Sequence, residues 1–476
     1  MTAIVEQWEL RARFAQALSD MYGKEVPSYT TLVEVTAEVN AEVMARLGLD
    51  AERFGTIDRV SAERHGAIRV GSEAEMRSVG RLFAGFGMYP VGFYDLRDAS
   101  ASSVPVVSTA FRPLDRVELA RNPFRVFTSM LVTDDRRFFS EDIQHRLDEF
   151  LSNRTLFPLD VLDLADRAAE HDGLNSADAD QFVAFATACF QLSDDPVDKA
   201  WYDALEAISS VAADIGGVTS THINHLTPRV LDIDVLFDRM RSRGIDMIDR
   251  IQGPPKWKGP DVLLRQTSFR ALAEPRQFVG ADSTVFSDAL RVRFGEVEAR
   301  GIALTQSGRD LYDRMIADLD ACAAADPSFD RAAAAVTVWA QNLPAHEKGL
   351  ALADLAYFTF RVNPDRDVSA TNPPADLKSL IEQDWVIAEP IVYEDFLPRS
   401  AAGIFQSNLT SDGSKNESQG TREHSIASIA AIIDRPVADP LDLYDAERAV
   451  SLRQVALDLG LSTVDVFGTE IRPEDL

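Results

Sequence analysis

The sequence predicts an α+β fold that contains two units with the order strand, helix, strand, strand, strand, together with added helical segments. Two observations support this class. Apolar residues recur every three to four positions in some stretches, as in helices, and alternate or form short runs in others, as in strands. In addition, the order of elements that begins near residue 65 recurs near residue 222, which indicates an internal repeat with little shared sequence.

The first repeat follows a helical segment at residues 1–60, whose apolar side chains recur at helical spacing. The repeat spans residues 61–135 and opens with a strand at 65–70. Ser72 and Glu75 have the spacing of a capping box, which predicts the start of a helix. Three apolar runs predict the remaining strands of this unit, at 91–96, 104–111 and 124–132.

The second repeat follows a helical insertion at residues 136–218. It spans residues 219–300 and opens with a strand at 222–226. A short helix begins after Asp234 and stops at Gly244. Three further strands are expected, at 245–251, 262–272 and 289–297.

The last segment, residues 301–476, predicts helices to about residue 360, a strand-like stretch at 385–396 and short helices near the C-terminus. Its polar, glycine- and serine-rich stretch at 407–422 predicts a long loop. We expect all five segments to form one composite catalytic domain, whose active site the last segment completes.

The composition argues against several classes of partner. The 476 residues carry 48 basic and 76 acidic side chains, a formal net charge of −28. Such a surface repels phosphate backbones and anionic lipids, so we expect neither nucleic acid nor membrane as a partner. Cys189 and Cys322 are isolated, which excludes a cysteine-based zinc site and fits a reducing compartment. The N-terminal residues include acids where a signal peptide has an apolar run, so we expect a cytoplasmic protein.

The histidines are the strongest candidates for chemistry, because the common glycine-rich, P-loop, serine-hydrolase and zinc-protease motifs are absent from the sequence. His65 lies on the first strand of the first repeat, and His222 and His225 lie on the first strand of the second. On the final strand of the second repeat, Glu296 and Glu298 share one face. Two histidines and one carboxylate would leave three positions open on an octahedral metal, as in non-haem Fe(II) oxygenases.

The spacing leaves alternatives open at this point. His222 and His225 are three residues apart and face opposite ways on a regular strand, so at most one of them is expected to bind a metal. All of these histidines could instead belong to hydrogen-bonded core networks. Arg69 shares a face with His65 at a distance of ~13 Å along the strand, within reach of the far carboxylate of a short dicarboxylic acid. A surface acid is the alternative partner of Arg69.

Five stretches of the sequence resemble a known family, and they occur in the family's order. The stretches are Arg64–Gly71, His222–Asp234, Leu264–Phe269, Arg293–Glu298 and Val392–Leu409. They are similar to the 2-oxoadipate dioxygenase/decarboxylases, also called hydroxyglutarate synthases, whose fold is related to the vicinal oxygen chelate enzymes. The resemblance implies that His65, His225 and Glu296 bind Fe(II) and that Arg69 binds the substrate together with His65.

The resemblance also implies a second substrate contact at Arg399 and Ser400, where the family has a small apolar residue in place of Arg399. The implied reaction converts 2-oxoadipate and O2, the expected small-molecule partners, to 2-hydroxyglutarate and CO2 in lysine catabolism. Two other functions are possible on the same scaffold. One is a metal-dependent isomerase or lyase, and the other is a binding protein that keeps the metal for structure.

Overall fold

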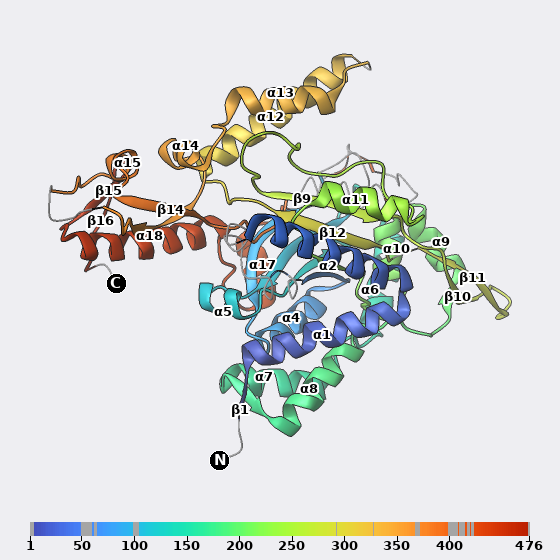
Figure 1. Ribbon diagram of the computed structural model, residues 1–476. Helices are drawn as coiled ribbons and strands as arrows, with labels where there is room; N and C mark the ends of the chain where they lie inside the picture. The colour runs from blue at the N-terminus through green and yellow to red at the C-terminus, as the bar shows by residue number, and fades with distance from the viewer. Residues whose placement is uncertain are drawn as a thin grey trace.

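The computed structural model describes residues 4–48, 60, 64–98, 104–291, 293–326, 328–366, 372–397, 408, 415–416, 419 and 423–474. A twisted sheet occupies the centre of the molecule, and helices surround it (Figure 1). Five strands are hydrogen-bonded in the order β3-β4-β5-β2-β8, and a parallel bridge between Arg229 and Glu298 continues this sheet into the pair β12-β9. The predicted α+β class is confirmed.

The first repeat forms the predicted unit. Its elements are β2 (Arg64–Val70), α4 (Glu73–Ala84), β3 (Tyr89–Asp95), β4 (Val106–Arg112), the short helix α5 (Arg116–Arg121) and β5 (Arg125–Leu131). Strand β2 pairs with β5 in parallel, so the first and last strands of the unit are neighbours. The side chain of Ser72 caps α4 by accepting a hydrogen bond from the backbone of Glu75. The Glu75 carboxylate does not close the capping box, because it accepts from the Gly71 backbone instead.

The second repeat has the same strand order, but its second strand is reduced to isolated bridges. Its elements are β8 (His225–Pro228), α11 (Ile233–Ser242), β9 (Leu264–Phe269) and β12 (Gly295–Arg300). Strand β12 lies between β8 and β9, as β5 lies between β2 and β4 in the first unit. The strand expected at 245–251 is wrong. Only single bridges form there, at Met247 and Gln252, because charged Asp246, Asp249 and Arg250 interrupt the apolar run.

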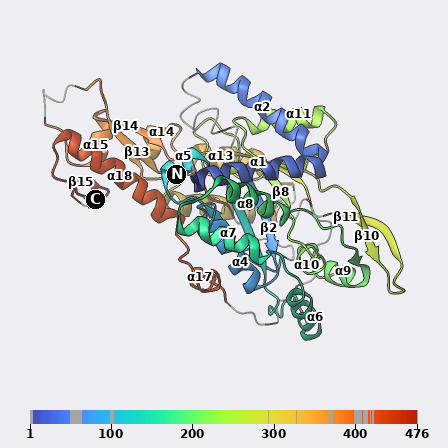
Figure 2. The ribbon, with the colours of Figure 1, turned by 90° about the horizontal axis from the view of Figure 1, so that it is seen from below.

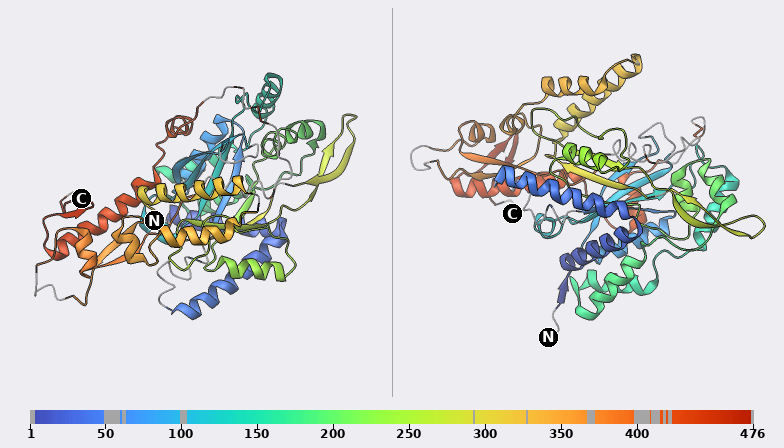
Figure 3. Two further views of the ribbon diagram at one scale, coloured as in Figure 1. Left: turned by 90° about the horizontal axis from the view of Figure 1, so that it is seen from above. Right: turned by 45° about the vertical axis from the view of Figure 1, so that its right-hand side comes forward.

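The final strand expected at 289–297 is present as β12 and carries Glu296, but it begins only at Gly295. A hairpin of β10 (Glu274–Val279) and β11 (Val285–Leu290) is inserted before β12, and it extends away from the sheet (Figure 3). The two repeats join at their first strands, where β2 and β8 run antiparallel and Ala67 lies opposite His225. A site built from both units therefore lies at the middle of the combined sheet.

Alternation along the strands separates the two faces of this sheet. Ile68 and Val126 face a layer that includes α1 (Gln7–Glu25), α4 and α8 (Ser176–Ala188), which Figure 2 shows from below. Ala67 and Phe127 face the opposite side and pack near α9 (Lys199–Glu206), α10 (Ser210–Gly216) and Phe396. His65 and Arg69 share the face of Ala67.

The helical segments before and between the repeats are present as predicted, with three short strands that were not expected. The N-terminal part contains β1 (Ile4–Glu6), α1 and α2 (Pro27–Leu47). The insertion contains α6 (Glu141–Ser152), α7 (Leu159–Glu170), β6 (Gly173–Asn175), α8, β7 (Val197–Asp198), α9 and α10. Tyr22 of α1 reaches the centre, where its hydroxyl donates to the carbonyl oxygens of Asn224 (2.9 Å) and Phe294 (2.8 Å).

The C-terminal part has a second hydrophobic core around Trp339 and Trp385. Its helices are α12 (Gln306–Ala325), α13 (Arg331–Asn342), α14 (Glu347–Leu352), α15 (Leu377–Glu382), α17 (Ile426–Ile433) and α18 (Pro440–Leu459). Its strands are β13 (Phe358–Val362), β14 (Val386–Pro390), β15 (Val464–Val466) and β16 (Thr469–Ile471). The expectation of only short closing helices is wrong, since α18 has 20 residues and packs against β13.

The strand-like stretch predicted at 385–396 divides into two parts. Only β14 is paired as a strand, whereas residues 391–396 run back to the central sheet. The loop predicted at 407–422 lies largely outside the described residues. Within the described ranges, none of the helices combines the length and apolar character needed to cross a membrane.

Candidate metal and substrate site

Three buried side chains from three strands meet where the two repeats join. One ligand atom from each of His65, His225 and Glu296 lies within 4.8 Å of the others. The His65 Nε2 atom is 3.2 Å from Glu296 Oε1, and His225 Nε2 is 3.7 Å from Glu296 Oε2. The structure thus brings together the three residues that the sequence singled out, and their atoms are those that a divalent transition metal prefers.

The two candidate histidines of the second repeat have different places. Strand β8 begins at His225, which therefore follows the pleat of the sheet; it lies opposite Ala67 and projects from the same face as His65. His222 precedes the strand, and its Nε2 atom lies 3.1 Å from the Asp214 carboxylate. Because His222 lies outside the strand, the alternation expected between the two histidines does not apply to it, and it is not part of the three-residue group.

Both histidines of the group present the same nitrogen to the site, because partners occupy the other one. The His65 Nδ1 atom lies 3.0 Å from Glu298 Oε2, and His225 Nδ1 lies 2.9 Å from the Thr227 hydroxyl. Glu298 therefore contacts the far side of the His65 ring and is no alternative to Glu296 at the site. Partners at Nδ1 fix the orientation of an imidazole whose Nε2 faces a metal.

The electrostatics differ between the two histidines. Burial lowers the pKa of His225 to about 4, although the negative charge of Glu296 acts in the opposite direction and would raise it. Burial also disfavours the protonated form of His65, but the Glu298 and Glu296 carboxylates outweigh it and raise the pKa of that ring. Burial alone would raise the pKa of Glu298, yet the charge of Arg300 holds it well below its usual range. A neutral His225 is the form that binds a metal.

Aromatic side chains enclose the group, and a glycine next to Glu296 makes room for a third ring, that of Phe269. Phe294 stacks on His225 with a centroid distance of 5.0 Å, and Phe396 meets His65 edge-on at 5.0 Å and 85°. At Gly295, between Phe294 and Glu296, an added Cβ would lie 1.8 Å from the Phe269 ring. Glycine is required here because the ring of the neighbouring strand occupies the space of any side chain.

Arg69 is buried on the site face and forms an ion pair with Asp214. The surface partner considered for Arg69 is wrong, since Asp214 is only 3% exposed. Asp214 also accepts from the Asn224 amide at 3.0 Å and contacts His222. Burial opposes the ionised form of Asp214, but His222 and Arg69 outweigh it and lower its pKa to about 2.

Sequence reasoning missed Asp214. One signal could have found it, because it is the single acid in the otherwise small and apolar helix α10. Arg399 and Ser400, the second predicted substrate contact, lie outside the described residues.

The segment Tyr393–Phe396, called the 393–396 segment below, is held against the sheet by buried arginines. Arg125 of β5 pairs with the Glu394 carboxylate at 2.6 Å, and Arg112 of β4 pairs with Asp395 at 2.9 Å. These contacts bring Phe396 from the C-terminal part of the chain to His65.

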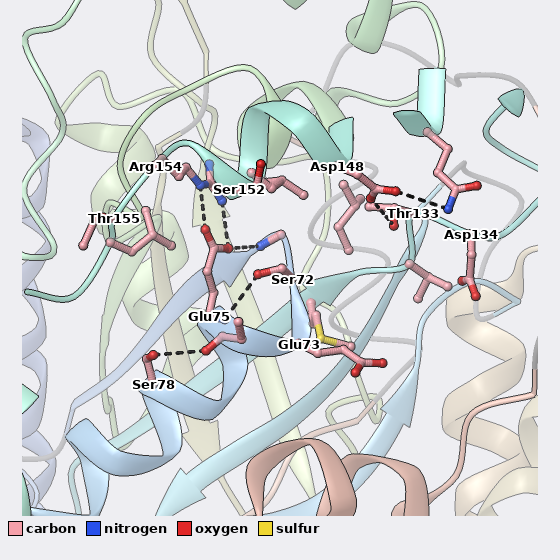
Figure 4. A pocket seen from close by; sticks show the side chains of 18 of the residues that line it. Ser72, Glu73, Glu75, Ser78, Thr133, Asp134, Asp148, Ser152, Arg154 and Thr155 are labelled. Carbon is pink, nitrogen blue, oxygen red and sulfur yellow. Dashed lines mark hydrogen bonds and ion pairs between the residues drawn. The ribbon is translucent and has the colours of Figure 1, made fainter. Parts of the chain in front are cut away.

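A separate cavity of about 600 Å³ lies beside the N-terminus of α4 (Figure 4). In it, the Glu75 carboxylate is held by Arg154 at 2.7 and 3.0 Å and by the Gly71 backbone. None of His65, His225 and Glu296 is among the described residues that line it. This cavity is distinct from the three-residue group.

The fold and the donor set define an α+β protein with a buried candidate metal site of two histidines and one carboxylate. The family model described as 2-oxoadipate dioxygenase/decarboxylase matches residues 14–408 of the chain. The chain belongs to this family, which confirms the family and enzyme class expected from its motifs.

Individual relatives cover almost the whole chain. The 2-oxoadipate dioxygenase/decarboxylase of Mycobacterium tuberculosis is 53% identical over 438 residues, 92% of this chain and 96% of that protein. The Escherichia coli protein of the same name is 41% identical over 458 residues, 94% of this chain and 98% of that protein. The crystal structure of hydroxyglutarate synthase from Pseudomonas putida in complex with 2-oxoadipate matches with a TM-score of 0.80 at 37% identity, covering 97% of this chain and 100% of that one.

Proposed function

We propose that this protein is an Fe(II)-dependent enzyme that converts 2-oxoadipate and O2 to 2-hydroxyglutarate and CO2, a step of lysine catabolism. The observation that carries the proposal is the convergence of His65, His225 and Glu296 within 4.8 Å, in a member of the 2-oxoadipate dioxygenase/decarboxylase family. The atoms balance, because both oxygen atoms of O2 are incorporated, one into the new carboxylate and one into the hydroxyl group.

His65, His225 and Glu296 would hold the Fe(II) ion. The donor set fits this ion, since two imidazole nitrogens and one carboxylate match the ligands of non-haem Fe(II) oxygenases. When bound, Fe(II) supplies a centre that polarises the 2-oxo acid and activates O2. The Nδ1 contacts of both rings, to Glu298 and Thr227, leave the Nε2 atoms directed at the site.

Arg69 would bind a carboxylate of the substrate and fix its orientation on the site face of β2. A guanidinium group matches the planar carboxylate with two parallel hydrogen bonds. Asp214 would keep Arg69 directed along the sheet, since it already contacts Arg69 through Nη1. Arg399 and Ser400 remain proposed as the second substrate contact.

Phe294 and Phe396 would exclude water from the reacting atoms. Their rings pack on His225 and His65 and leave an apolar wall beside the ligand atoms. A water-excluded site strengthens the charge interactions that hold a dianion and limits side reactions of activated oxygen.

The decisive experiment measures O2 consumption by protein loaded anaerobically with Fe(II), against a panel of 2-oxo dicarboxylic acids. We expect equal amounts of O2 consumed, CO2 released and 2-hydroxyglutarate formed from 2-oxoadipate. Turnover without O2 would instead identify an isomerase or lyase. Binding without turnover of any 2-oxo acid would identify a non-catalytic binding protein.

A further inference from the structure

We propose that Glu298 is a positioning residue for the metal ligand His65, and that Arg300 couples this contact to the 393–396 segment. The inference rests on the proposed metal site. It extends that site to a carboxylate and a guanidinium group that contact no metal themselves but determine how one ligand faces it.

The spacing along β12 places the three relevant side chains in one row. Glu296, Glu298 and Arg300 are two residues apart, so all three project from the same face of the strand. Glu296 contacts the Nε2 atom of His65, and Glu298 contacts its Nδ1 atom. One strand therefore supplies both a candidate metal ligand and the group that orients a second ligand.

Glu298 is held in place by Arg300 with little freedom to move. The carboxylate is 0% exposed, and it accepts from Arg300 Nε at 2.7 Å and from Nη2 at 2.9 Å. The two bonds fix the plane of the carboxylate, so its Oε2 atom stays 3.0 Å from the imidazole of His65. The carboxylate lies beside Nδ1 without a well-aligned hydrogen bond to it, so it acts on the ring through its negative charge and by filling the space next to that nitrogen. A charged partner on the far side of a ligating imidazole favours the orientation in which Nε2 faces the metal.

Arg300 also contacts a second part of the chain. Its Nη1 atom donates to the carbonyl oxygens of Tyr393 at 2.8 Å and Asp395 at 3.0 Å. The guanidinium group therefore bridges β12 and the 393–396 segment. Lysine cannot replace Arg300, because one ammonium group cannot donate to the Glu298 carboxylate and to the two backbone carbonyl oxygens in the same planar geometry.

The 393–396 segment also contacts His65 directly. Its last residue, Phe396, packs edge-on against the His65 ring at 5.0 Å, and the Arg300 guanidinium lies 5.6 Å from the Phe396 ring. Glu298 thus limits rotation of the imidazole at Nδ1, and Phe396 limits its tilt. A displacement of the segment would reach His65 through both contacts.

The test compares Co(II) binding by metal-free protein and the variant Glu298→Gln. Co(II) reports both affinity and ligand geometry through its visible absorption. We expect Glu298→Gln to bind Co(II) about 10- to 100-fold more weakly, the usual effect of removing an outer partner of a ligand. We also expect an altered absorption spectrum, which a loss of stability alone would not produce.

Glu75→Gln is the matched control. Glu75 is also buried and also receives two bonds from one arginine, Arg154, but it contacts no histidine of the site. Both variants lose one buried ion pair, so both should unfold at a lower temperature. Only Glu298→Gln should change the Co(II) affinity and spectrum, whereas equal weakening in Glu75→Gln would overturn the inference.

The remaining outcomes separate this inference from the proposed function. If the unchanged protein binds Co(II) and Glu298→Gln binds it equally well with the same spectrum, the positioning role is wrong and the metal site stands. If the unchanged protein binds no metal, both are wrong. Should Glu298→Gln fail to fold, Arg300→Lys carries the same test. We expect at least threefold weaker Co(II) binding for this variant, and unchanged binding would overturn the inference.

Discussion

Replacing Arg69 with lysine tests whether this side chain holds the substrate. Arg69 is 4% exposed and contacts Asp214 through one nitrogen of its guanidinium group. Lysine keeps the positive charge, but its single ammonium group cannot hold Asp214 and also present a fork to a carboxylate. Asp214 would retain His222 and Asn224 as partners, so the fold around it should persist in the variant.

The expected loss of transition-state stabilisation corresponds to one charge-assisted hydrogen bond, which contributes about 1.5–3 kcal/mol. In Arg69→Lys this corresponds to roughly a 10- to 150-fold decrease of kcat/KM on 2-oxoadipate. Affinity for Co(II) should be unchanged, because Arg69 contributes no atom to the three-residue group. The metal titration therefore separates a substrate effect from a general disturbance of the site.

A second substrate identifies which carboxylate Arg69 binds. Arg69 lies four residues from His65 along β2, or about 13 Å between their backbones, which favours the carboxylate far from the metal. 2-Oxohexanoate lacks that carboxylate, so we expect the variant to lose less activity on it than on 2-oxoadipate. Equal losses on both would assign Arg69 to the near carboxylate, and an unchanged kcat/KM on 2-oxoadipate would refute its role in the site.

Three further predictions follow from the site. His225→Ala should abolish Co(II) binding while His222→Ala retains at least part of it, because only His225 faces Glu296; the opposite pattern in a titration would reverse the assignment. Gly295→Ala should lower the free energy of unfolding by about 1–3 kcal/mol and weaken Co(II) binding, since Phe269 must move. Its control Gly460→Ala, at φ +65° with nothing within 4 Å, should affect stability alone. In the folded protein the pKa of Asp214 is lowered to about 2, so its ionised form stabilises the fold above pH ~4. This contribution to the free energy of unfolding is lost as the pH falls toward 2. In urea unfolding of the metal-free protein, the stability difference between the unchanged protein and Asp214→Asn should shrink by about 2 kcal/mol across that interval, and a constant difference would contradict this assignment.

The sequence predicts the repeat well where each strand carries its own periodic signal. β2 and β5 contain short stretches of apolar and β-branched residues between turn signals, and both occur close to the expected positions. The stretch 245–251 has a similar apolar content but only two adjacent buried residues, Met247 and Ile248, so it forms single bridges rather than a strand. The hairpin before β12 was missed because β11 is largely exposed and carries little apolar alternation.

The sequence predicted the types of residue at the site, but it did not by itself determine which of two equivalent residues lies in the three-residue group. Periodicity places Glu296 and Glu298 on one face and cannot distinguish them. The structure does so through their neighbours, since Arg300 neutralises Glu298 and Gln266 donates to Glu296. Arg300, two residues after Glu298, is a local signal that could have indicated the paired carboxylate. No local signal connects Arg69 with Asp214, because 145 positions separate them.

Buried arginine–carboxylate pairs surround the candidate site, and their energetics argue for a geometric role. Arg69, Arg112, Arg125 and Arg300 are each paired with a buried carboxylate. Such pairs add little to stability, because removing both charges from water offsets their attraction, whereas losing one partner costs about 3–5 kcal/mol. Each pair therefore adds little to the free energy of folding, but breaking it is costly. The two charged side chains stay together, and the residues that contact them are held in one arrangement. Around this site those neighbours are a proposed metal ligand, the arginine proposed to bind substrate and the segment that carries Phe396. We infer that the pairs fix the geometry on which the proposed chemistry depends, rather than the overall stability of the fold.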